Sequence, residues 1–254
     1  MSEQQKPDTG RRDFLGATAA ATAAGLGFVT LAPGMQLIKF AEANAAASQG
    51  ASSKVRWGML IDTTRCATGC TDCVTACATE NGIETGTGRP GQSSQWIRKI
   101  ELKEQKTGLE ISLPMMCQHC AEPPCVDVCP TGASFKRADG IVLVDRHTCI
   151  GCRYCMMACP YKARSFVHET LTQQNPEVPR GKGCVESCTL CVHRVDKGQQ
   201  PACVEACSKG DHTAMLFGDL NNPSSEIAKR IATTATSQVR ADLRLDPGVR
   251  YQGI

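Results

Sequence analysis

The sequence has few aromatic residues and carries none of the common catalytic motifs. Six Phe, three Tyr and two Trp are few for a chain of 254 residues. We find no nucleophile–base pair, phosphate loop or dinucleotide fingerprint, so nothing suggests a substrate pocket. No block of Lys and Arg stands out, and a formal net charge of +3 is too small to suggest nucleic acid as a partner. Something other than aromatic packing must help to organise the interior.

Long apolar runs are also missing beyond the N-terminal segment. No later stretch approaches the roughly eighteen consecutive apolar residues of a membrane-spanning helix. We therefore expect the mature chain to be soluble or peripherally bound, with any membrane attachment supplied by a partner.

Residues 1–47 are predicted to be a twin-arginine export signal. Arg11 and Arg12 are followed by a weakly apolar run to about Leu31 and by small residues over 41–47. This order of charged region, apolar region and cleavage zone is typical of export signals. The paired arginines resemble a twin-arginine motif.

A transmembrane anchor capped by the arginine pair is the alternative. Pro33 and Gly34 interrupt the apolar run before a convincing span is complete, which favours export. The twin-arginine translocase carries folded proteins, so metal can be inserted in the cytoplasm before the chain crosses the membrane. We therefore expect a periplasmic protein, attached to the inner membrane through partners, whose thiolates are already bound to metal in an oxidising compartment.

Seventeen cysteines are the most informative feature of the sequence. Sixteen fall into four groups, each ending in C-x3-C: group one is Cys66, Cys70, Cys73 and Cys77; group two is Cys117, Cys120, Cys125 and Cys129; group three is Cys149, Cys152, Cys155 and Cys159; group four is Cys188, Cys191, Cys203 and Cys207. Disulfides would not require this repeated spacing, and seventeen is odd. Zinc prefers isolated C-x2-C pairs and could fit group four alone. The dense spacing favours iron–sulfur clusters.

Group three matches the bacterial ferredoxin run C-x2-C-x2-C-x3-C-P from Cys149 to Pro160. In such a run the first three cysteines bind one cluster and the fourth binds a neighbouring cluster. Group two keeps the x3 interval and the Cys-Pro ending, and a hairpin around Asp139-Gly140 is expected to join it to group three. Groups one and four supply the complementary halves of a second two-cluster unit.

The predicted fold class is α+β, with two ferredoxin-like dicluster units, the inner one inserted into the outer one. The outer unit comprises 48–94 and 184–220, the inner unit 95–183, and a C-terminal helix and tail 221–254. Strands are expected at 55–61, 96–102, 110–114, 141–144 and 214–217. Short helices are expected after the fourth cysteine of each group, with the following proline in the first turn. Residues 224–235 are expected to be helical, and the last residues to form a strap.

Several residues near the groups have less specific patterns. Cys184 is left over and is interpreted as a spare thiol or an alternative ligand. His119 lies inside group two, but a surface or hydrogen-bonding histidine is expected there, since every cluster already has four sulfurs. His168, His193 and Arg194 are at most hydrogen-bonding neighbours that tune a cluster.

These motifs resemble the four-cluster iron–sulfur subunits of DMSO reductase-type and related membrane oxidoreductases. The resemblance covers about residues 55–220 and rests on Cys-Gln-His-Cys-Ala-Glu-Pro-Pro-Cys at 117–125, Cys-Pro-Thr-Gly-Ala at 129–133, the run at 149–160, Cys-Thr-Leu-Cys at 188–191 and Pro-Ala-Cys at 201–203. It implies four [4Fe–4S] clusters and single-electron relay without catalysis of a substrate reaction. With about −2 per oxidised site, the net charge would shift from +3 to about −5.

The resemblance also implies which cysteines share a cluster. The implied sets are Cys66, Cys70 and Cys73 with Cys207; Cys77 with Cys188, Cys191 and Cys203; Cys117, Cys120 and Cys125 with Cys159; and Cys129 with Cys149, Cys152 and Cys155.

Within this family the chain looks like the DsrO type, the periplasmic subunit of the DsrMKJOP complex associated with sulfite reduction. Its own export signal, its altered first group and its short length carry this narrower resemblance. A polytopic quinone-interacting membrane subunit and a multihaem cytochrome c are the partners it implies. An iron–sulfur subunit of a molybdopterin oxidoreductase or hydrogenase shares the chemistry and differs in partner. A cluster-bearing assembly or sensing protein is the alternative from another class.

Overall fold

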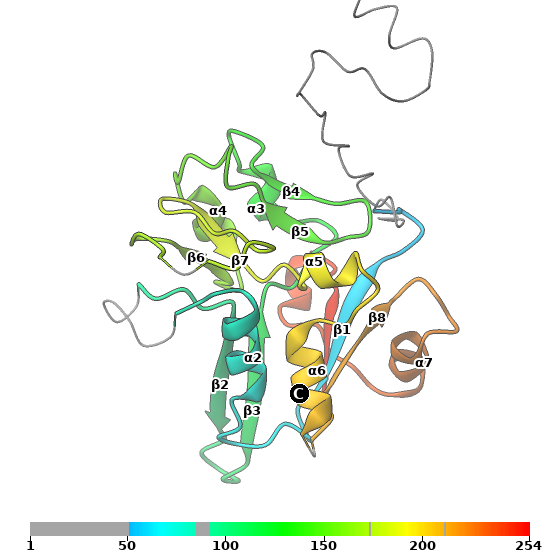
Figure 1. The fold of residues 1–254 in the computed structure, drawn as a ribbon. Helices are drawn as coiled ribbons and strands as arrows, with labels where there is room; N and C mark the ends of the chain where they lie inside the picture. The colour runs from blue at the N-terminus through cyan, green and yellow to red at the C-terminus, as the bar shows by residue number, and fades with distance from the viewer. Residues whose placement is uncertain (1–50, 85–91, 173, 211) are drawn as a thin grey trace, which may run out of the picture. The chain divides into compact units, whose positions relative to one another are not determined.

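The computed structural model describes residues 51–84, 92–172, 174–210 and 212–254 (Figure 1). The predicted export signal, with Arg11 and Arg12, lies outside the described residues. All described residues belong to the unit Ser48–Ile254. Short helices and small sheets make up its fold, so its composition is α+β, while the two ferredoxin-like units stay a prediction. Within the described part of the chain, no helix has the length and apolar character needed to cross a bilayer.

A three-stranded sheet has β1 (Trp57–Asp62) at its centre. β1 pairs antiparallel with β8 (Met215–Asp219) and parallel with β9 (Val249–Gln252). Five of its six residues are buried, as expected of a central strand that is covered on both faces. Gly58 is required here because a Cβ atom would lie 2.6 Å from the Gly248 carbonyl oxygen. The strands predicted at 55–61 and 214–217 match β1 and β8 to within two residues.

The other three sheets of the described residues each consist of two antiparallel strands. They are β2 (Ile97–Lys103) with β3 (Glu110–Met116), β4 (Ser134–Lys136) with β5 (Val142–Val144), and β6 (Arg164–Phe166) with β7 (Val185–Ser187). The predicted hairpin at Asp139-Gly140 is confirmed, with Gly140 at φ 88° and a 2.8 Å bond from the Arg137 N–H to the Ile141 carbonyl. β7 lies in the segment predicted for the outer unit, yet it pairs with β6 from the segment predicted for the inner unit.

The helices are α2 (Asp72–Glu80), α3 (Pro124–Asp127), α4 (Tyr154–Ala158), α5 (Val192–Val195), α6 (Ala202–Lys209) and α7 (Glu226–Thr233), with a 3-10 turn at Ala241–Leu243. The prediction that helices follow the fourth cysteine of each group is wrong. α2, α3, α4 and α6 begin one residue before the third cysteine instead.

Proline explains part of this difference. Cys159 ends α4 in an extended conformation, with φ −74° and ψ 112°, because Pro160 disfavours the helical region for the residue before it. Pro160 therefore stops a helix where the sequence suggested that it would start one. α2 and α6 have no such proline and continue past Cys77 and Cys207.

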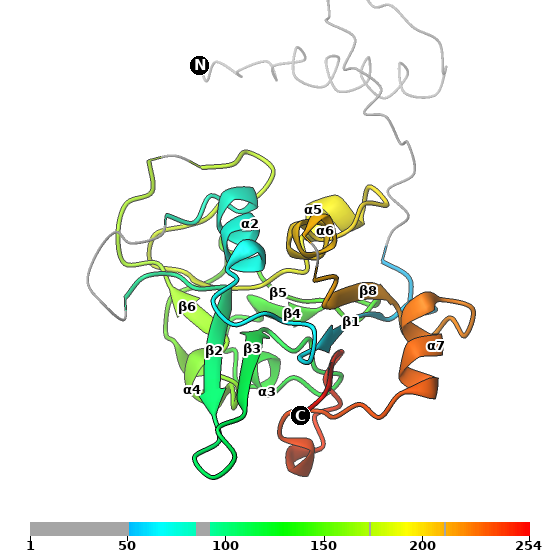
Figure 2. The same ribbon diagram turned by 90° about the horizontal axis from the view of Figure 1, so that it is seen from below.

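The C-terminal tail joins the central sheet to the loop of group two. The expected helix is confirmed as α7, capped by the Ser225 hydroxyl oxygen, which accepts the Ala228 N–H at 3.2 Å. The expected strap is the strand β9, which lies beside β1 near the C-terminus (Figure 2). Tyr251 of β9 is fully buried; its hydroxyl donates to the Pro114 carbonyl and accepts from the Gln118 amide, both at 3.1 Å.

Truncation of Tyr251 should open the central sheet. We expect Tyr251→Phe to lower the opening free energy of β1 by about 1–3 kcal/mol, because Pro114 and Gln118 lose a buried partner. Tyr251→Ala should lower it by about 3–5 kcal/mol, since it also leaves a cavity. Native-state hydrogen exchange at the β1 amides measures both changes. Unchanged protection in Tyr251→Ala would show that the tail does not hold the sheet; Arg240→Ala, at an exposed ion pair, is the control.

Candidate iron–sulfur sites

The sixteen predicted cysteines gather into four sets of four, and each set draws on two sequence groups. Site A contains Cys66, Cys70, Cys73 and Cys207; site B contains Cys77, Cys188, Cys191 and Cys203; site C contains Cys117, Cys120, Cys125 and Cys159; site D contains Cys129, Cys149, Cys152 and Cys155. The thiols of sites A and D each line one hollow. Within site B, the thiols lie close enough to interact electrostatically with one another, and the same holds within site C. These are the sets that the resemblance implied, and their role as ligands stays a prediction.

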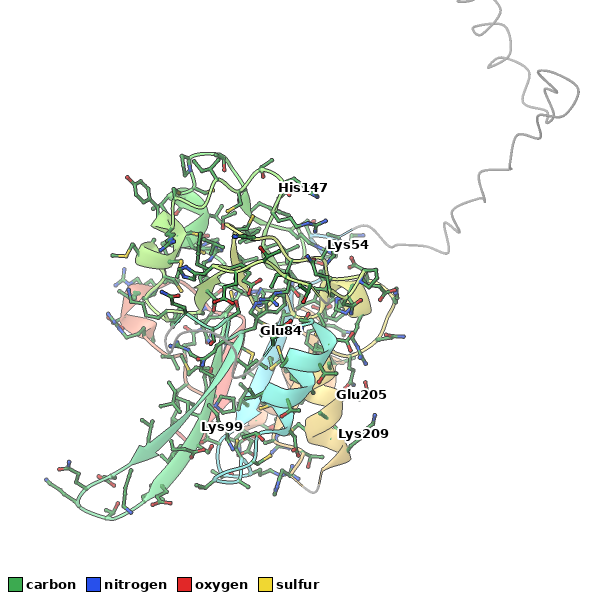
Figure 3. All side chains as sticks on the ribbon, turned by 60° about the vertical axis from the view of Figure 1, so that its left-hand side comes forward. Lys54, Glu84, Lys99, His147, Glu205 and Lys209 are labelled. Atoms are coloured by element: carbon green, nitrogen blue, oxygen red, sulfur yellow. The ribbon has the colours of Figure 1, made fainter. Side chains whose placement is uncertain are left out.

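Site A lies between the loop before α2 and the end of α6. Lys99 of β2 lines the same hollow (Figure 3), and its ammonium donates to the backbone carbonyls of Ala67 and Cys70. The Cys207 thiol accepts the Ala214 N–H at 3.2 Å. A buried cation and a backbone donor therefore face the sulfurs of this site.

Site B is the most deeply buried of the four, since each of its cysteines is at most 5% exposed. Burial raises the pKa of Cys188 and Cys203 well above the ordinary thiol value, and the neighbouring thiols add to the shift. The Leu190 N–H donates to the Cys188 sulfur at 3.4 Å, and the Asn81 amide donates to the Cys77 sulfur at 3.6 Å.

Site C lies beneath the loop of group two. Burial raises the pKa of Cys117 and of Cys120 to about 12. The Arg164 guanidinium, on β6, donates to the Cys125 sulfur at 3.1 Å. A buried cation thus faces site C as Lys99 faces site A, although here it contacts a sulfur directly.

Site D is the most open of the four sites. Cys152 is exposed, and Ile150, which lines the same hollow, is 67% exposed. Desolvation raises the pKa of the Cys129 thiol. Hydrogen bonds from the Ser134 N–H, at 3.3 Å, and from Thr131 outweigh this effect, so the pKa is lowered overall. The site therefore combines donors to sulfur with access to the surface.

Two antiparallel helices connect sites A and B. α2 carries Cys73 to site A and, one turn later, Cys77 to site B. α6 carries Cys203 to site B and Cys207 to site A, so the two helices run in opposite directions. They lie side by side in Figures 1 and 2. One helical turn separates neighbouring sites.

Sites C and D are related in the same way. α3 places Cys125 at site C and Cys129, just beyond its end, at site D; α4 places Cys155 at site D and Cys159 at site C. α3 packs against α4. In each group, the third and fourth cysteines, which are separated by three residues, therefore belong to two neighbouring sites.

Each cysteine group contains left-handed backbone that turns the loop around its site. Gly69 has φ 79° in group one, where glycine bears no strain. His119, Arg153, Leu190 and Cys191 have φ between 44° and 65° in the other three groups. This conformation costs non-glycine residues about 1–3 kcal/mol each and persists where the surrounding structure requires it. The strain is concentrated in the loops that carry the thiols.

The donor sets fit [4Fe–4S] clusters. A metal-ligating cysteine must be a thiolate, and burial opposes ionisation at most of these thiols. An iron core with a 2+ charge would compensate four such thiolates, and the N–H groups at sites A, B and D point at sulfurs, as they do around clusters.

Among the described residues, no three Cys, His, Asp or Glu side chains converge closely enough to hold one metal ion. A cubane is bound differently, because each thiolate contacts its own iron at a separate corner. All seventeen cysteines are described, and all are free thiols.

The seventeenth cysteine lies beside site D. Cys184 is buried, and its thiol donates to the Arg146 carbonyl at 3.3 Å. Burial is the main cause of a raised pKa of the Cys184 thiol, and the nearby Cys149 thiol raises it further. Cys184 is a neighbour of site D and is not among the cysteines that line its hollow.

The histidines named from the sequence have distinct environments. His119 is a buried hydrogen-bonding residue and not a surface one; its Nδ1 accepts the Val142 N–H at 3.0 Å, and burial lowers its pKa to about 3. His193 and Arg194 both bind the Glu80 carboxylate at the end of α2, at 2.8 and 2.9 Å. His119 is therefore the hydrogen-bonding histidine of the two alternatives, and a tuning role for His193 and Arg194 stays a prediction.

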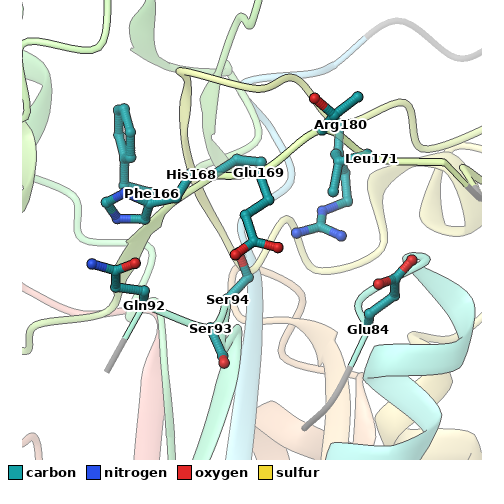
Figure 4. Close-up of a pocket in the computed structure, with 11 residues that line it drawn as sticks. Glu84, Gln92, Ser93, Ser94, Phe166, His168, Glu169, Leu171 and Arg180 are labelled. Atoms are coloured by element: carbon teal, nitrogen blue, oxygen red, sulfur yellow. The ribbon is translucent and has the colours of Figure 1, made fainter. Parts of the chain in front are cut away.

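A separate hollow lies between residues 92–94 and the loop after β6 (Figure 4). His168, Glu169 and Glu84 line it, together with Arg180, which binds Glu186 through two hydrogen bonds of 2.7 and 2.9 Å. No cysteine lines this hollow. The His168 ring packs edge-on against Phe166, which in turn packs against the buried cluster that contains Cys155 of site D.

Sequence reasoning missed Lys99 and Arg164, the two buried cations beside the thiols. A lysine in a predicted strand and an arginine after a cysteine run are ordinary features with no spacing signal. Only the folded chain brings Lys99 to group one and Arg164 to group two.

Comparison with known proteins gives one family and several long matches. Residues 110–220 match the family described as 4Fe-4S dicluster domain. The chain is 42% identical to the Hdr-like menaquinol oxidoreductase iron-sulfur subunit 1 of Archaeoglobus fulgidus, over 95% of this chain and 97% of that protein. It is 36% identical to a subunit of tetrathionate reductase from Salmonella typhimurium (97% and 89%) and to the menaquinone reductase iron-sulfur cluster-binding subunit of Nitratidesulfovibrio vulgaris (78% and 89%).

Serine substitutions test the crossed arrangement of α2 and α6. We expect Cys73→Ser and Cys207→Ser to remove the same EPR signal from the reduced protein and about four irons per chain. Cys77→Ser should remove a different signal, although Cys77 is only four residues from Cys73. Cys184→Ser should keep every signal and is the control. Loss of one common signal in Cys73→Ser and Cys77→Ser would contradict the assignment.

Proposed function

The chain belongs to the family of iron–sulfur electron-transfer subunits of oxidoreductase complexes, and on that premise we propose that it relays single electrons between a quinone-interacting membrane subunit and a multihaem cytochrome c. It is not the catalytic subunit of such a complex. Four [4Fe–4S] clusters, one at each of sites A to D, would each take up and release one electron. The chain's own residues hold the thiolates, donate N–H groups to sulfur and exclude water.

The observation that carries this proposal is the pairing of sites by shared helices. Cys73 of site A and Cys203 of site B are close enough to interact electrostatically, and so are Cys125 of site C and Cys155 of site D. Neighbouring sites separated by one helical turn suit a relay. The open site D offers a partner access to one end of its pair.

Quinone linkage is supported by the names of two relatives, a menaquinol oxidoreductase subunit and a menaquinone reductase subunit. Membrane partners are implied because such complexes reach a lipid-soluble quinone. From its export signal, its altered first cysteine group and its short length, we further propose that this chain is of the DsrO type and is linked to sulfite and sulfur metabolism. The cytochrome partner follows from the same assignment.

Periplasmic localisation follows from the N-terminal segment. The Arg11-Arg12 pair would direct the folded, cluster-loaded chain to the twin-arginine translocase. A chain that carries its own signal would meet its partners outside the cytoplasm, attached to the inner membrane through them.

A second candidate is the electron-transfer subunit of a terminal reductase. The match to the tetrathionate reductase subunit, over 97% of this chain, favours it. The chemistry within this chain would be the same, and only the partner would differ. Isolation of the native complex and identification of its subunits separates the two candidates.

The native membrane complex should be reducible by quinol. We expect about sixteen irons in this subunit, four per cluster, and bleaching of its clusters by menaquinol, followed by reoxidation through an added haem partner. Iron analysis and visible spectroscopy measure both. About eight irons, or clusters that quinol leaves oxidised, would contradict the relay.

Export should depend on the arginine pair. Replacement of both Arg11 and Arg12 by Lys should leave the precursor in the cytoplasm with its clusters assembled, because the translocase recognises the pair itself. Fractionation and immunoblotting measure the distribution. Lys6→Arg changes a nearby cation conservatively and should be exported normally. Efficient export of the double variant would refute the twin-arginine route.

A further inference from the structure

Arg164 is a buried cation that lies between sites C and D. It begins β6, five residues after the last cysteine of group three, and is 6% exposed. Its Nη2 donates to the Cys125 sulfur of site C at 3.1 Å and to the Ser134 hydroxyl at 2.8 Å. The guanidinium also faces the thiols of Cys117 at site C and Cys155 at site D.

The guanidinium lacks an ordinary counter-ion. Among the described residues, its electrostatic neighbours include the cysteines of sites C and D and the buried imidazole of His119, and no Asp or Glu forms an ion pair with it. Its Nε and Nη1 atoms are buried and have no hydrogen-bond partner. Leaving a charge buried and unpaired is strongly destabilising. The charge and the free N–H groups of Arg164 therefore match an anion that would occupy sites C and D.

We propose that Arg164 is the shared counter-cation of the clusters at sites C and D and raises the reduction potentials of both. This inference rests on the proposed function, since it requires clusters at these sites. Reduction adds one negative charge to a cluster, and a nearby cation stabilises the reduced form more than the oxidised form. Hydrogen bonds to sulfur and net charge are established determinants of cluster potential.

Arginine suits this position better than lysine does. Its planar guanidinium stays charged and presents several N–H groups in a fixed fork, so one side chain can face two sites. Lys99, at site A, instead directs its ammonium to two backbone carbonyls. At site B, the negatively charged Glu80 carboxylate lies near the thiols of Cys77 and Cys191. Lys99 thus faces one site without contacting its sulfurs, whereas Arg164 donates directly to a sulfur of site C and also faces site D.

EPR-monitored redox titration of the cluster-loaded chain tests this proposal. We expect Arg164→Gln to shift two of the four reduction potentials to more negative values and to leave the other two unchanged. Arg164→Lys keeps the charge but loses the fork, so the same two potentials should shift by less. Arg137→Gln removes a cation that binds Asp139 and Asp196 near the β4–β5 hairpin, and it should shift none.

The outcomes separate this proposal from the proposed function. A wild-type chain without four clusters would refute the relay itself. A fully loaded Arg164→Gln chain with four unchanged potentials, or with all four lowered equally, would overturn the role of Arg164. If Arg164→Gln fails to bind all its clusters, Arg164→Lys decides, because a negative shift confined to the same pair of signals supports the proposal and no shift overturns it.

Discussion

The convergence of sixteen thiols in fours is the constraint on which the rest of the structure depends. Buried thiolates repel one another and lose hydration, so each site is stable only with a compensating charge at its centre. The sites draw on distant sequence groups: α6 must return antiparallel to α2 to complete site A, and α4 must meet α3 to complete site C. On the proposed function, metal binding and folding would therefore be one process in a core with few aromatic side chains.

The small sheets serve this arrangement. β1 is the central strand, β8 leads from the end of α6 into it, and β9 closes it from the C-terminus. Tyr251 of β9 connects this sheet to group two, because its hydroxyl forms hydrogen bonds with Pro114 and Gln118, on either side of Cys117. The tail thereby ties the sheet beside site A to the loop of site C, and the pairing of β7 with β6 ties group four to site D. The four sites are parts of one continuous scaffold.

The four cysteine groups were predictable from sequence because cysteine spacing is a local signal, and the resemblance implied how the groups combine. The helices across the x3 interval were not predicted, because they were expected to follow the fourth cysteine. The β4–β5 hairpin was visible through Asp139-Gly140, and five strands through their apolar residues. Three-residue strands such as β4, β6 and β7 have no periodicity long enough to detect. The helix positions were misjudged because Pro160 can either start a helix or end one. Arg164 and Lys99 were hidden because their importance depends on tertiary contacts alone.

The fold of this subunit brings its cysteine sites together in pairs, and on the proposed function Arg164 would set the potentials of the clusters at sites C and D. The central claim is that each site takes iron through cysteines of two sequence groups. Anomalous diffraction at the iron absorption edge, on crystals of the natively purified protein, tests this most directly. We expect iron density at four positions, each between thiolates of two groups. Density within single groups, or a signal at the zinc edge in its place, would contradict the claim.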